Sequence, residues 1–258
     1  EKYLGKTFDI HGGGMDLVFP HHEAEIAQSN SCNNCNPVNY WMHNNMITVD
    51  GKKMGKSLGN FINLEEFFTG NHKKLDRAYS PMCIRFFILQ AHYRSTLDFS
   101  NEALQAAEKG CLKLMNAMET VEKISASENS TFDVNDLEKN CYAAMDDDFN
   151  TPILIAHLFD GVRIINSVKD GKESLTSSDL EKLKSILNTF VTGILGLVSG
   201  GGNNGNDLTN EVMDLVLKLR GNAKNNKDFD TADLIREELD KVGIQVKDSR
   251  EGSSWEVK

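Results

Sequence analysis

The hydrophobic period changes near residue 60, and this change constrains the fold more than any other feature of the 258-residue chain. Before it, short apolar stretches at 8–10 and 46–49 alternate with glycine-, histidine- and asparagine-rich segments, which is typical of strands and loops. Beyond it, apolar residues recur at steps of three and four, as in the stretch that Ser100 would cap. The sequence therefore predicts a mainly α-helical protein with a small N-terminal α/β part.

The pattern predicts five successive regions. An apolar run at 82–91 is typical of a buried helix, and the long amphipathic stretches that follow are typical of a helical bundle. The small and polar sequence SGGGNNGND would form a flexible linker. The predicted regions are an α/β part at 1–60, a connecting region at 61–100, the bundle at 101–198, the linker at 199–207 and a small α+β domain at 208–258.

Charge is unevenly distributed along the sequence. Residues 1–100 carry 10 basic and 10 acidic side chains, whereas residues 101–258 carry 18 basic and 28 acidic ones. The acidic second part argues against nonspecific nucleic-acid binding through bulk charge, while a local basic path stays open. Because no apolar run reaches the roughly 18 residues that a membrane helix needs, we expect no membrane span.

The cysteines and the start of the sequence bear on its compartment. Only Cys32 and Cys35 are close together, and no basic-then-apolar leader is visible, so we expect reduced thiols in the cytoplasm. The sequence begins at Glu1, almost on top of a motif and without Met. We therefore expect the N-terminal part of a longer protein to be missing.

A cluster of histidines and glutamates follows Pro20. His21 and Glu25 are four residues apart, so on a helix both would reach one metal ion, while His22 and Glu23 would point elsewhere. Carboxylates that stabilise the helix dipole are the alternative. Two ligands are too few for zinc, which usually takes four, so further ligands would have to come from other segments.

Cys32 and Cys35 have the spacing of paired thiolate ligands, which is half of a zinc knuckle. A single pair of this kind also occurs in loops of proteins from a reducing compartment, and both interpretations stay open. A structural zinc site built from His21 and these two cysteines is a further alternative.

A basic turn, KKMGKS, follows the second predicted strand. Its GKS at 55–57 resembles the end of a P-loop, but that motif needs a glycine where this chain has Asp50. What remains is a loop of small residues and ammonium groups, which suits a polyphosphate whose charge grows in a transition state. A solvated surface turn is the alternative.

Three consecutive glycines follow His11 and precede Met15 and Asp16. Glycine lets a ligand approach the backbone closely, and the Asp16 carboxylate could accept hydrogen bonds from ribose hydroxyls. A glycine run also suits a flexible loop, so this stretch identifies no site by itself.

Taken together, these motifs resemble those of the cysteinyl-tRNA synthetases, a family of class I aminoacyl-tRNA synthetases. The resemblance covers essentially the whole chain in order. It is carried by FDIHGGGMDLVFPHHEAEIAQS at 8–29, NYWMHNNMITVDGKKMGKSLGN at 39–60, AHYRSTLDFS at 91–100, AMDDDFNTP at 144–152, KDFDTADLIREELDKVGI at 227–244 and the ending at 252–255.

The resemblance implies a cysteine–tRNA ligase that works in two steps. Cysteine and ATP, with Mg²⁺, would give cysteinyl-adenylate and pyrophosphate, and the cysteinyl group would then pass to the 3′ end of tRNA(Cys). The implied fold is the C-terminal part of a Rossmann-like class I catalytic domain, a helical bundle on the anticodon side and a small anticodon-recognition domain. A monomer is expected.

The resemblance also implies roles for residues of this chain. His21 and Glu25 match two ligands of the family's zinc ion, which suits a cysteine substrate because a soft thiolate binds Zn²⁺ well and a hydroxyl does not. Lys56 and Lys53 match the lysines of the KMSKS loop, which steadies the ATP phosphates. ATP would also contact Gly12, Gly13, Gly14 and Asp16, and the substrate cysteine would lie close to His11.

Two departures from the family pattern matter. Gly55 stands where the family usually has serine, which removes a hydroxyl and loosens the loop, while both lysines remain. The family's HIGH motif and its two cysteine ligands are absent, and Cys32 and Cys35 do not occupy those positions. We therefore expect a fragment that is inactive alone and holds zinc weakly, with a non-catalytic tRNA-binding module as the alternative.

Four residues near the end of the chain match positions that the family is expected to use for anticodon bases. Phe229 could stack on a base, and the carboxylates could accept hydrogen bonds from exocyclic amines. A core position for Phe229 and a dipole role for Asp233 are the alternatives. The four residues are Lys224, Phe229, Asp233 and Asp248.

Overall fold

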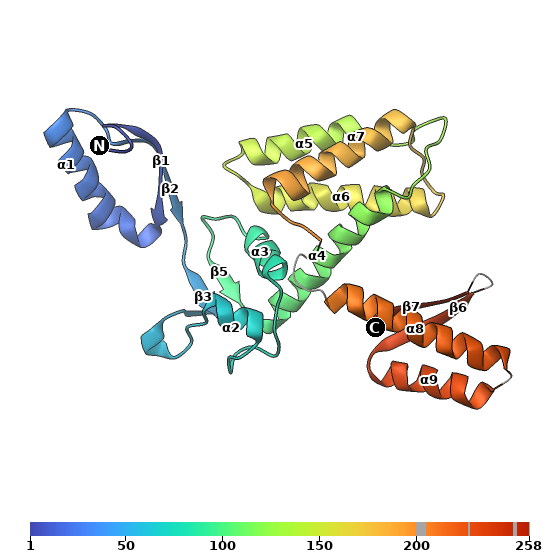
Figure 1. The fold of residues 1–258 in the computed structure, drawn as a ribbon. Helices are drawn as coiled ribbons and strands as arrows, with labels where there is room; N and C mark the ends of the chain where they lie inside the picture. Colours follow the sequence, from blue (N-terminus) through green and yellow to red (C-terminus); the bar gives the residue numbers. More distant parts are fainter. Residues whose placement is uncertain (200–204, 227, 250–251, 258) are drawn as a thin grey trace. The chain divides into compact units, whose positions relative to one another are not determined.

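The structure, a computed structural model, describes residues 1–199, 205–226, 228–249 and 252–257 (Figure 1). The chain forms two compact units, Glu1–Gly200 and Gly201–Lys258. The predicted fold class is confirmed, since helices dominate and the sheets are small. Among the described residues, every helix is too short or too polar to cross a bilayer.

The first unit opens with two parallel strands joined through a helix, which is a βαβ arrangement. β1 (Phe8–Gly14) pairs with β2 (Val38–Asn44). The connection contains η1 (Met15–Leu17), η2 (Val18–His22) and α1 (Glu23–Asn33). The sequence predicts a helical stretch at 21–29; the α-helix itself begins at Glu23, and His21 and His22 belong to the preceding η2.

A second small sheet carries the lysine turn. β3 (Ile47–Val49) pairs antiparallel with β4 (Lys52–Lys53) and parallel with β5 (Leu97–Phe99). The chain then forms η3 (Lys56–Leu58), a single turn of 3₁₀-helix. The basic segment follows β3, as the sequence predicted, but Lys52 and Lys53 form a short strand of their own and only Lys56 lies beyond it.

Two helices connect this sheet to the bundle. They are α2 (Leu64–Thr69), which begins with a capping box, and α3 (Pro81–Leu89), which begins with a serine cap. Apolar side chains of α3 are almost fully buried, including Phe86 with no exposed surface. The apolar run at 82–91 is therefore a core helix, as predicted.

The bundle contains four long helices, of which α5, α6 and α7 lie side by side (Figure 1). Ser100 caps the first of them as predicted, because its hydroxyl accepts a hydrogen bond from the Ala103 amide. The helices are α4 (Asn101–Val121), α5 (Val134–Asp146), α6 (Thr151–Lys169) and α7 (Ser177–Leu187), the last continuing into η4 (Asn188–Ile194).

The sequence predicts a helix capped by Thr151 and another that begins with a capping box at Ser178, and both predicted starts are wrong by one or two residues. Asn150, and not Thr151, caps α6, because the Asn150 side chain accepts from the Ile153 amide. Thr176 caps α7 through the Asp179 amide, whereas a capping box starting at residue 178 was expected. In both cases the residue that forms the cap, one or two positions before the expected one, also has a suitable side-chain oxygen, so the sequence alone could not choose.

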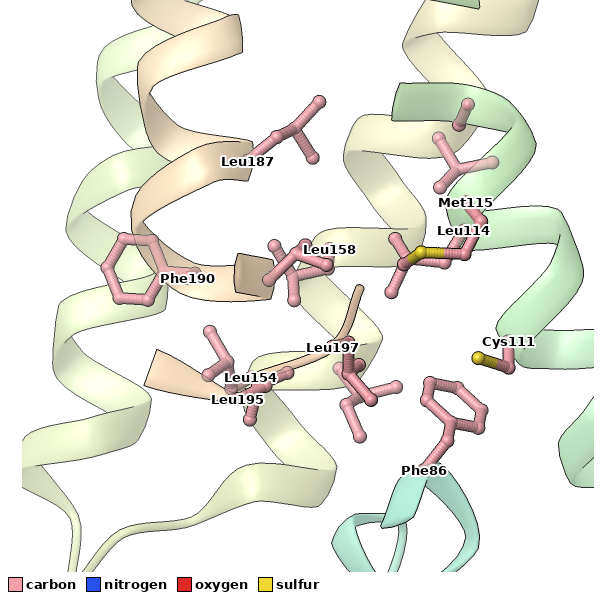
Figure 2. Close-up of a cluster of buried hydrophobic side chains, with 14 of the residues drawn as sticks. Phe86, Cys111, Leu114, Met115, Leu154, Leu158, Leu187, Phe190, Leu195 and Leu197 are labelled. Carbon is pink, nitrogen blue, oxygen red and sulfur yellow. The ribbon is translucent and has the colours of Figure 1, made fainter. Parts of the chain in front are cut away.

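One continuous core unites α3 with the bundle (Figure 2). In Figure 2, Phe86 of α3 lies beside Cys111 of α4, and Leu197 lies between Phe86 and the pair Leu154 and Leu195. Burying such side chains contributes about 1.5–3 kcal/mol each before entropy is counted. The connecting region is therefore packed as one body with the bundle.

The second unit contains two helices and a hairpin. They are α8 (Gly205–Asn225), α9 (Phe229–Lys241), β6 (Ile244–Ser249) and β7 (Gly252–Val257), the two strands pairing antiparallel. The apolar stretches at 244–246 and 255–257 predict a hairpin around the turn at Gly252, and this hairpin is present. The sequence predicts the first helix at 210–219; the observed helix is longer, since it begins at Gly205, inside the segment predicted as a linker, and ends at Asn225.

Candidate functional site

The parallel strands place four aromatic side chains together. Register pairs His11 of β1 with Trp41 of β2 and places His43 opposite Gly13. The rings of His11 and Trp41 stack with centroids 4.8 Å apart, and the His22 ring lies 4.8 Å from both. Alternate residues of a strand share a face, which brings Trp41 and His43 onto the side where His22 lies.

His22 is held at the centre of this cluster. It is 5% exposed, and its Nδ1 lies 2.8 Å from Nε2 of His43, a hydrogen-bond distance. Burial, with smaller contributions from His22, His11 and Arg94, lowers the pKa of His43 below its ordinary value. The cationic form of the His43 imidazole is therefore disfavoured at this position.

Gly13 makes this packing possible. A Cβ atom at Gly13 would lie 2.6 Å from Cε1 of His22 and 3.2 Å from Leu17 Cδ1. A Cβ atom at Gly12 would meet only the Met42 carbonyl oxygen, at 3.8 Å. The two adjacent glycines thus differ: only the second is required for the imidazole to approach the strand.

Three possible metal ligands converge at the same place. One ligand atom each from His11, His22 and Glu25 lies within 4.8 Å of the others, and His11 Nδ1 is 3.5 Å from Glu25 Oε2. Within the described ranges, His21 belongs to no such group, and its side chain is exposed. The expectation that His22 would point elsewhere was wrong.

The expectation about His22 failed because Glu25 shares a helix face with the residue three positions before it, His22, as well as with the residue four positions before it, His21. Spacing favoured His21, whereas contacts from β2, which spacing cannot reveal, fix His22 against Trp41 and His43. The role of His21 as a ligand stays a prediction.

Asp16 and Lys53 line one cavity of about 280 Å³. Asp16 approaches Gly14 so closely that a Cβ atom there would lie 2.3 Å from its Oδ1. Of the glycines and lysines assigned to ATP, this cavity contains Gly14 and Lys53 but not Gly12, Gly13 or Lys56. Its other lining residues are Asn44, Asn45, Met46, Ile47 and Met54.

Lys56 rests outside this cavity. Its Nζ lies over the ring of Phe61, 5.4 Å from the centroid, a cation–π distance. Lys56 is exposed and sits on η3, one turn beyond the strand that carries Lys53. Lys53 therefore lines the cavity, whereas the Lys56 side chain lies against Phe61.

Several residues of this site were missed by sequence reasoning. His22, Trp41, His43 and Asn45 all contribute to the cluster or the cavity. The alternation Trp41–Met42–His43 was an available signal, because on a strand a period of two puts the two aromatic residues on one face. Nothing in the sequence placed Asn45 at the cavity, since it lies between two strands.

Cys32 and Cys35 are free thiols. The Thr7 hydroxyl donates to Cys35 Sγ at 3.7 Å, and neither cysteine joins a group of three possible ligands in the part of the chain that the structure describes. A local zinc site built from His21, Cys32 and Cys35 therefore finds no support in the geometry.

In the second unit, Asp233 lines a cavity of about 540 Å³ between α9 and β6. Phe229 is 61% exposed and is therefore not the core residue considered as an alternative. Lys224 is half-buried, and the side chain of Asp248 lies outside the described residues. The other lining residues of this cavity are Arg236, Glu237, Asp240, Lys241, Gln245 and Val246.

Comparisons with known families match two parts of the chain. Residues 1–109 match the catalytic domain of class I (C) tRNA synthetases, and residues 140–199 match the DALR domain. A crystallised LeuRS from a LeuRS–tRNA–LeuAMS complex of Agrobacterium radiobacter K84 has the same fold over 74% of this chain and 25% of that one. Its TM-score is 0.53 and its sequence identity 16%.

Curated relatives match over the whole chain. Proteins named cysteine--tRNA ligase from Bacteroides fragilis and Parabacteroides distasonis are 56% and 55% identical, over 99% and 100% of this chain. One from Phocaeicola vulgatus is 57% identical over 100% of it. The chain spans about half the length of these relatives, 52–53%. By sequence and by the order of its domains, the chain belongs to the cysteine–tRNA ligase family of class I tRNA synthetases.

Proposed function

We propose that the protein containing this chain is a cysteine–tRNA ligase, which activates cysteine with ATP and transfers it to tRNA(Cys). The observation that carries the proposal is that Asp16 and Lys53, assigned to ATP from their motifs, line one cavity. The strand that precedes Asp16 also carries His11, which belongs to the imidazole and carboxylate group. A nucleotide site and a site for the amino acid would thus be built on neighbouring turns.

The donor set fits zinc. Two imidazole nitrogens and a carboxylate oxygen within 4.8 Å of one another are ligands that Zn²⁺ accepts, and they leave room for more. Glu25 would hold the ion together with His21, as the resemblance implies, or with His22 and His11, which lie nearest to it. When bound, zinc would supply a soft acceptor for the substrate thiol, which serine lacks.

The remaining residues would hold and orient ATP with its Mg²⁺. The carboxylate of Asp16 would accept hydrogen bonds from the ribose hydroxyls, and Gly14 gives it the space to do so. Lys53 and Lys56 would place ammonium groups against the phosphates, where negative charge grows during adenylate formation. Lys56 would leave Phe61 to reach them.

The bundle and the second unit would bind tRNA. Exposed Phe229 could stack on an anticodon base, while Asp233 and Lys224 would form polar contacts beside it. Asp248 is assigned to the same surface from its motif. These contacts would be local, because the acidic overall charge disfavours nonspecific binding.

Cysteine-dependent exchange of pyrophosphate into ATP tests the proposal. The protein is expressed at the full length of its relatives, and exchange is measured with and without cysteine. We expect exchange only with cysteine, and we expect Glu25→Gln to reduce it because one ligand loses its charge. Exchange at background level in the unaltered protein would refute the proposed function.

A further inference from the structure

Asn60 is one of three polar or charged side chains that are buried in the part of the chain that the structure describes. The other two are His22, in the imidazole cluster, and Arg220, in the second unit. Burying an amide stabilises a fold only when its hydrogen-bonding groups find partners. The partners of Asn60 therefore indicate what its side chain is for.

Both partners belong to the backbone of the lysine turn. Asn60 Nδ2 donates to the Lys53 carbonyl oxygen at 3.0 Å, and the Gly55 N–H donates to Asn60 Oδ1 at 3.0 Å. In extended backbone, the C=O of one residue and the N–H of the residue two positions later face the same side. A primary amide can satisfy both groups, so Asn60 acts as a one-residue strand partner.

The opposite edge of the same segment is held by β3. Lys53 pairs with Thr48, and the Met54 N–H donates to the Ile47 carbonyl oxygen at 3.3 Å. The segment from Lys53 to Gly55 thus has partners on both sides, a strand on one and a single side chain on the other.

Asn60 is itself well anchored. Gly59 adopts a left-handed conformation, with φ of 64°, which ends η3 and turns the chain back toward the segment at 53–55. Ile62, two residues after Asn60, is 5% exposed and belongs to the hydrophobic core. Asn60 is therefore fixed by its neighbours in the core, and its side chain in turn holds an otherwise exposed loop in place.

We propose that Asn60 is the positioning residue of the lysine turn, setting Lys53 and the start of η3, and with it Lys56, relative to the cavity lined by Asp16. This inference rests on the proposed function. Gly55, which has no side chain, gives the turn extra backbone freedom, so the turn depends on this amide for its order. Asn60 touches neither substrate nor reacting atoms and acts only through the two lysines.

Two variants separate the two hydrogen bonds. Asn60→Ala removes both, whereas Asn60→Asp has almost the same shape, keeps the acceptor for Gly55 and removes the donor to Lys53. Asn63→Asp is the matched control: it adds the same charge three residues away, and aspartate caps α2 as well as asparagine does. Thermal unfolding of all three variants checks that each one folds.

Amide hydrogen exchange of this chain, followed by NMR, tests whether the Asn60 side chain holds the lysine turn, and it does not require activity. We expect the Gly55 amide to exchange about tenfold faster in Asn60→Ala and at an unchanged rate in Asn63→Asp. An unchanged rate at Gly55 in a folded Asn60→Ala protein would overturn the proposal.

Pyrophosphate exchange by the full-length protein tests the consequence for the reaction. We expect both Asn60 variants to lower the turnover number by about 10- to 100-fold. The KM for cysteine should not change, because both hydrogen bonds of the Asn60 amide go to the lysine turn and neither goes to the imidazole cluster. A merely structural role would lower activity only in proportion to the unfolded fraction.

The outcomes separate the two proposals. If the unaltered protein is active and the Asn60 variants turn over as fast as Asn63→Asp, the positioning role is wrong and the proposed function stands. If the unaltered protein shows no cysteine-dependent exchange, the proposed function fails, and the role of Asn60 in that reaction fails with it.

Discussion

Replacing Gly13 by alanine should break the imidazole cluster, while the same change at Gly12 should leave it intact. In Gly13→Ala, the new Cβ would lie 2.6 Å from Cε1 of His22, whereas carbon atoms in contact are about 3.5 Å apart. The ring must therefore move by about 1 Å. Its 2.8 Å approach to His43 then exceeds the range of a hydrogen bond.

The expected energy follows from this displacement. Forcing an extra methyl group into a packed site costs about 1–3 kcal/mol. Both alanine variants share the small gain from a less flexible unfolded chain, about 0.4–1 kcal/mol. The difference between Gly13→Ala and Gly12→Ala therefore isolates the contact with His22, and we expect it to be about 2 kcal/mol.

Trp41 is a suitable local reporter for this experiment, because its ring lies 4.8 Å from both His11 and His22. The chain has two tryptophans, so Trp255→Phe leaves Trp41 as the sole source of indole fluorescence. Urea unfolding followed at this residue should give a lower midpoint for Gly13→Ala than for Gly12→Ala. Equal midpoints, with unchanged imidazole NMR shifts in both variants, would refute the packing argument.

Other predictions concern the lysine turn, the cysteines and a helix end. Lys56→Ala should raise the barrier to adenylate formation in the full-length protein by about 2–4 kcal/mol in a single-turnover assay, whereas Lys52→Ala should not change it. Equal effects of the two changes would refute the assignment of Lys56 to the ATP phosphates. Gly70→Ala should unfold at lower urea than Gly171→Ala, because both glycines have positive φ but only a Cβ at Gly70 meets backbone, the Ala78 nitrogen at 2.5 Å. Burial raises the pKa of two cysteine thiols from 9.0 to about 12, so at pH 8 the folded chain should react slowly with thiol reagents at these positions, and rapid labelling would contradict this. The neutral thiols favour the folded state below pH 9, and this contribution to the free energy of unfolding should be lost as the pH rises from 9 to 12. These cysteines are Cys83 and Cys141.

Periodicity and turn chemistry predicted most of the helices, because an amphipathic face and a capping side chain are local properties. The serine cap at Ser100 and the hairpin near Gly252 are examples. Boundaries failed where two neighbouring residues could both act as the cap, as at Asn150 and Thr151.

The site was harder to predict because its members come from separate elements. Spacing along one helix identified Glu25, but it could not tell which imidazole the neighbouring strand would hold, and the structure places His22 there. The assignment of Asp16 and Lys53 came from motifs, and only the fold brings them to one cavity. Asn60 had no signal in the sequence, since its partners are backbone groups.

Reversible removal of metal from the full-length protein is the most direct test of the central claim, that the carboxylate of Glu25 and the neighbouring imidazoles hold an ion that selects the cysteine thiol. Pyrophosphate exchange is measured with cysteine and with serine, before chelation, after it, and after Zn²⁺ is returned. We predict exchange with cysteine and not with serine, loss of this exchange on chelation and its recovery when Zn²⁺ is returned. Undiminished cysteine-dependent exchange in metal-free protein would contradict it.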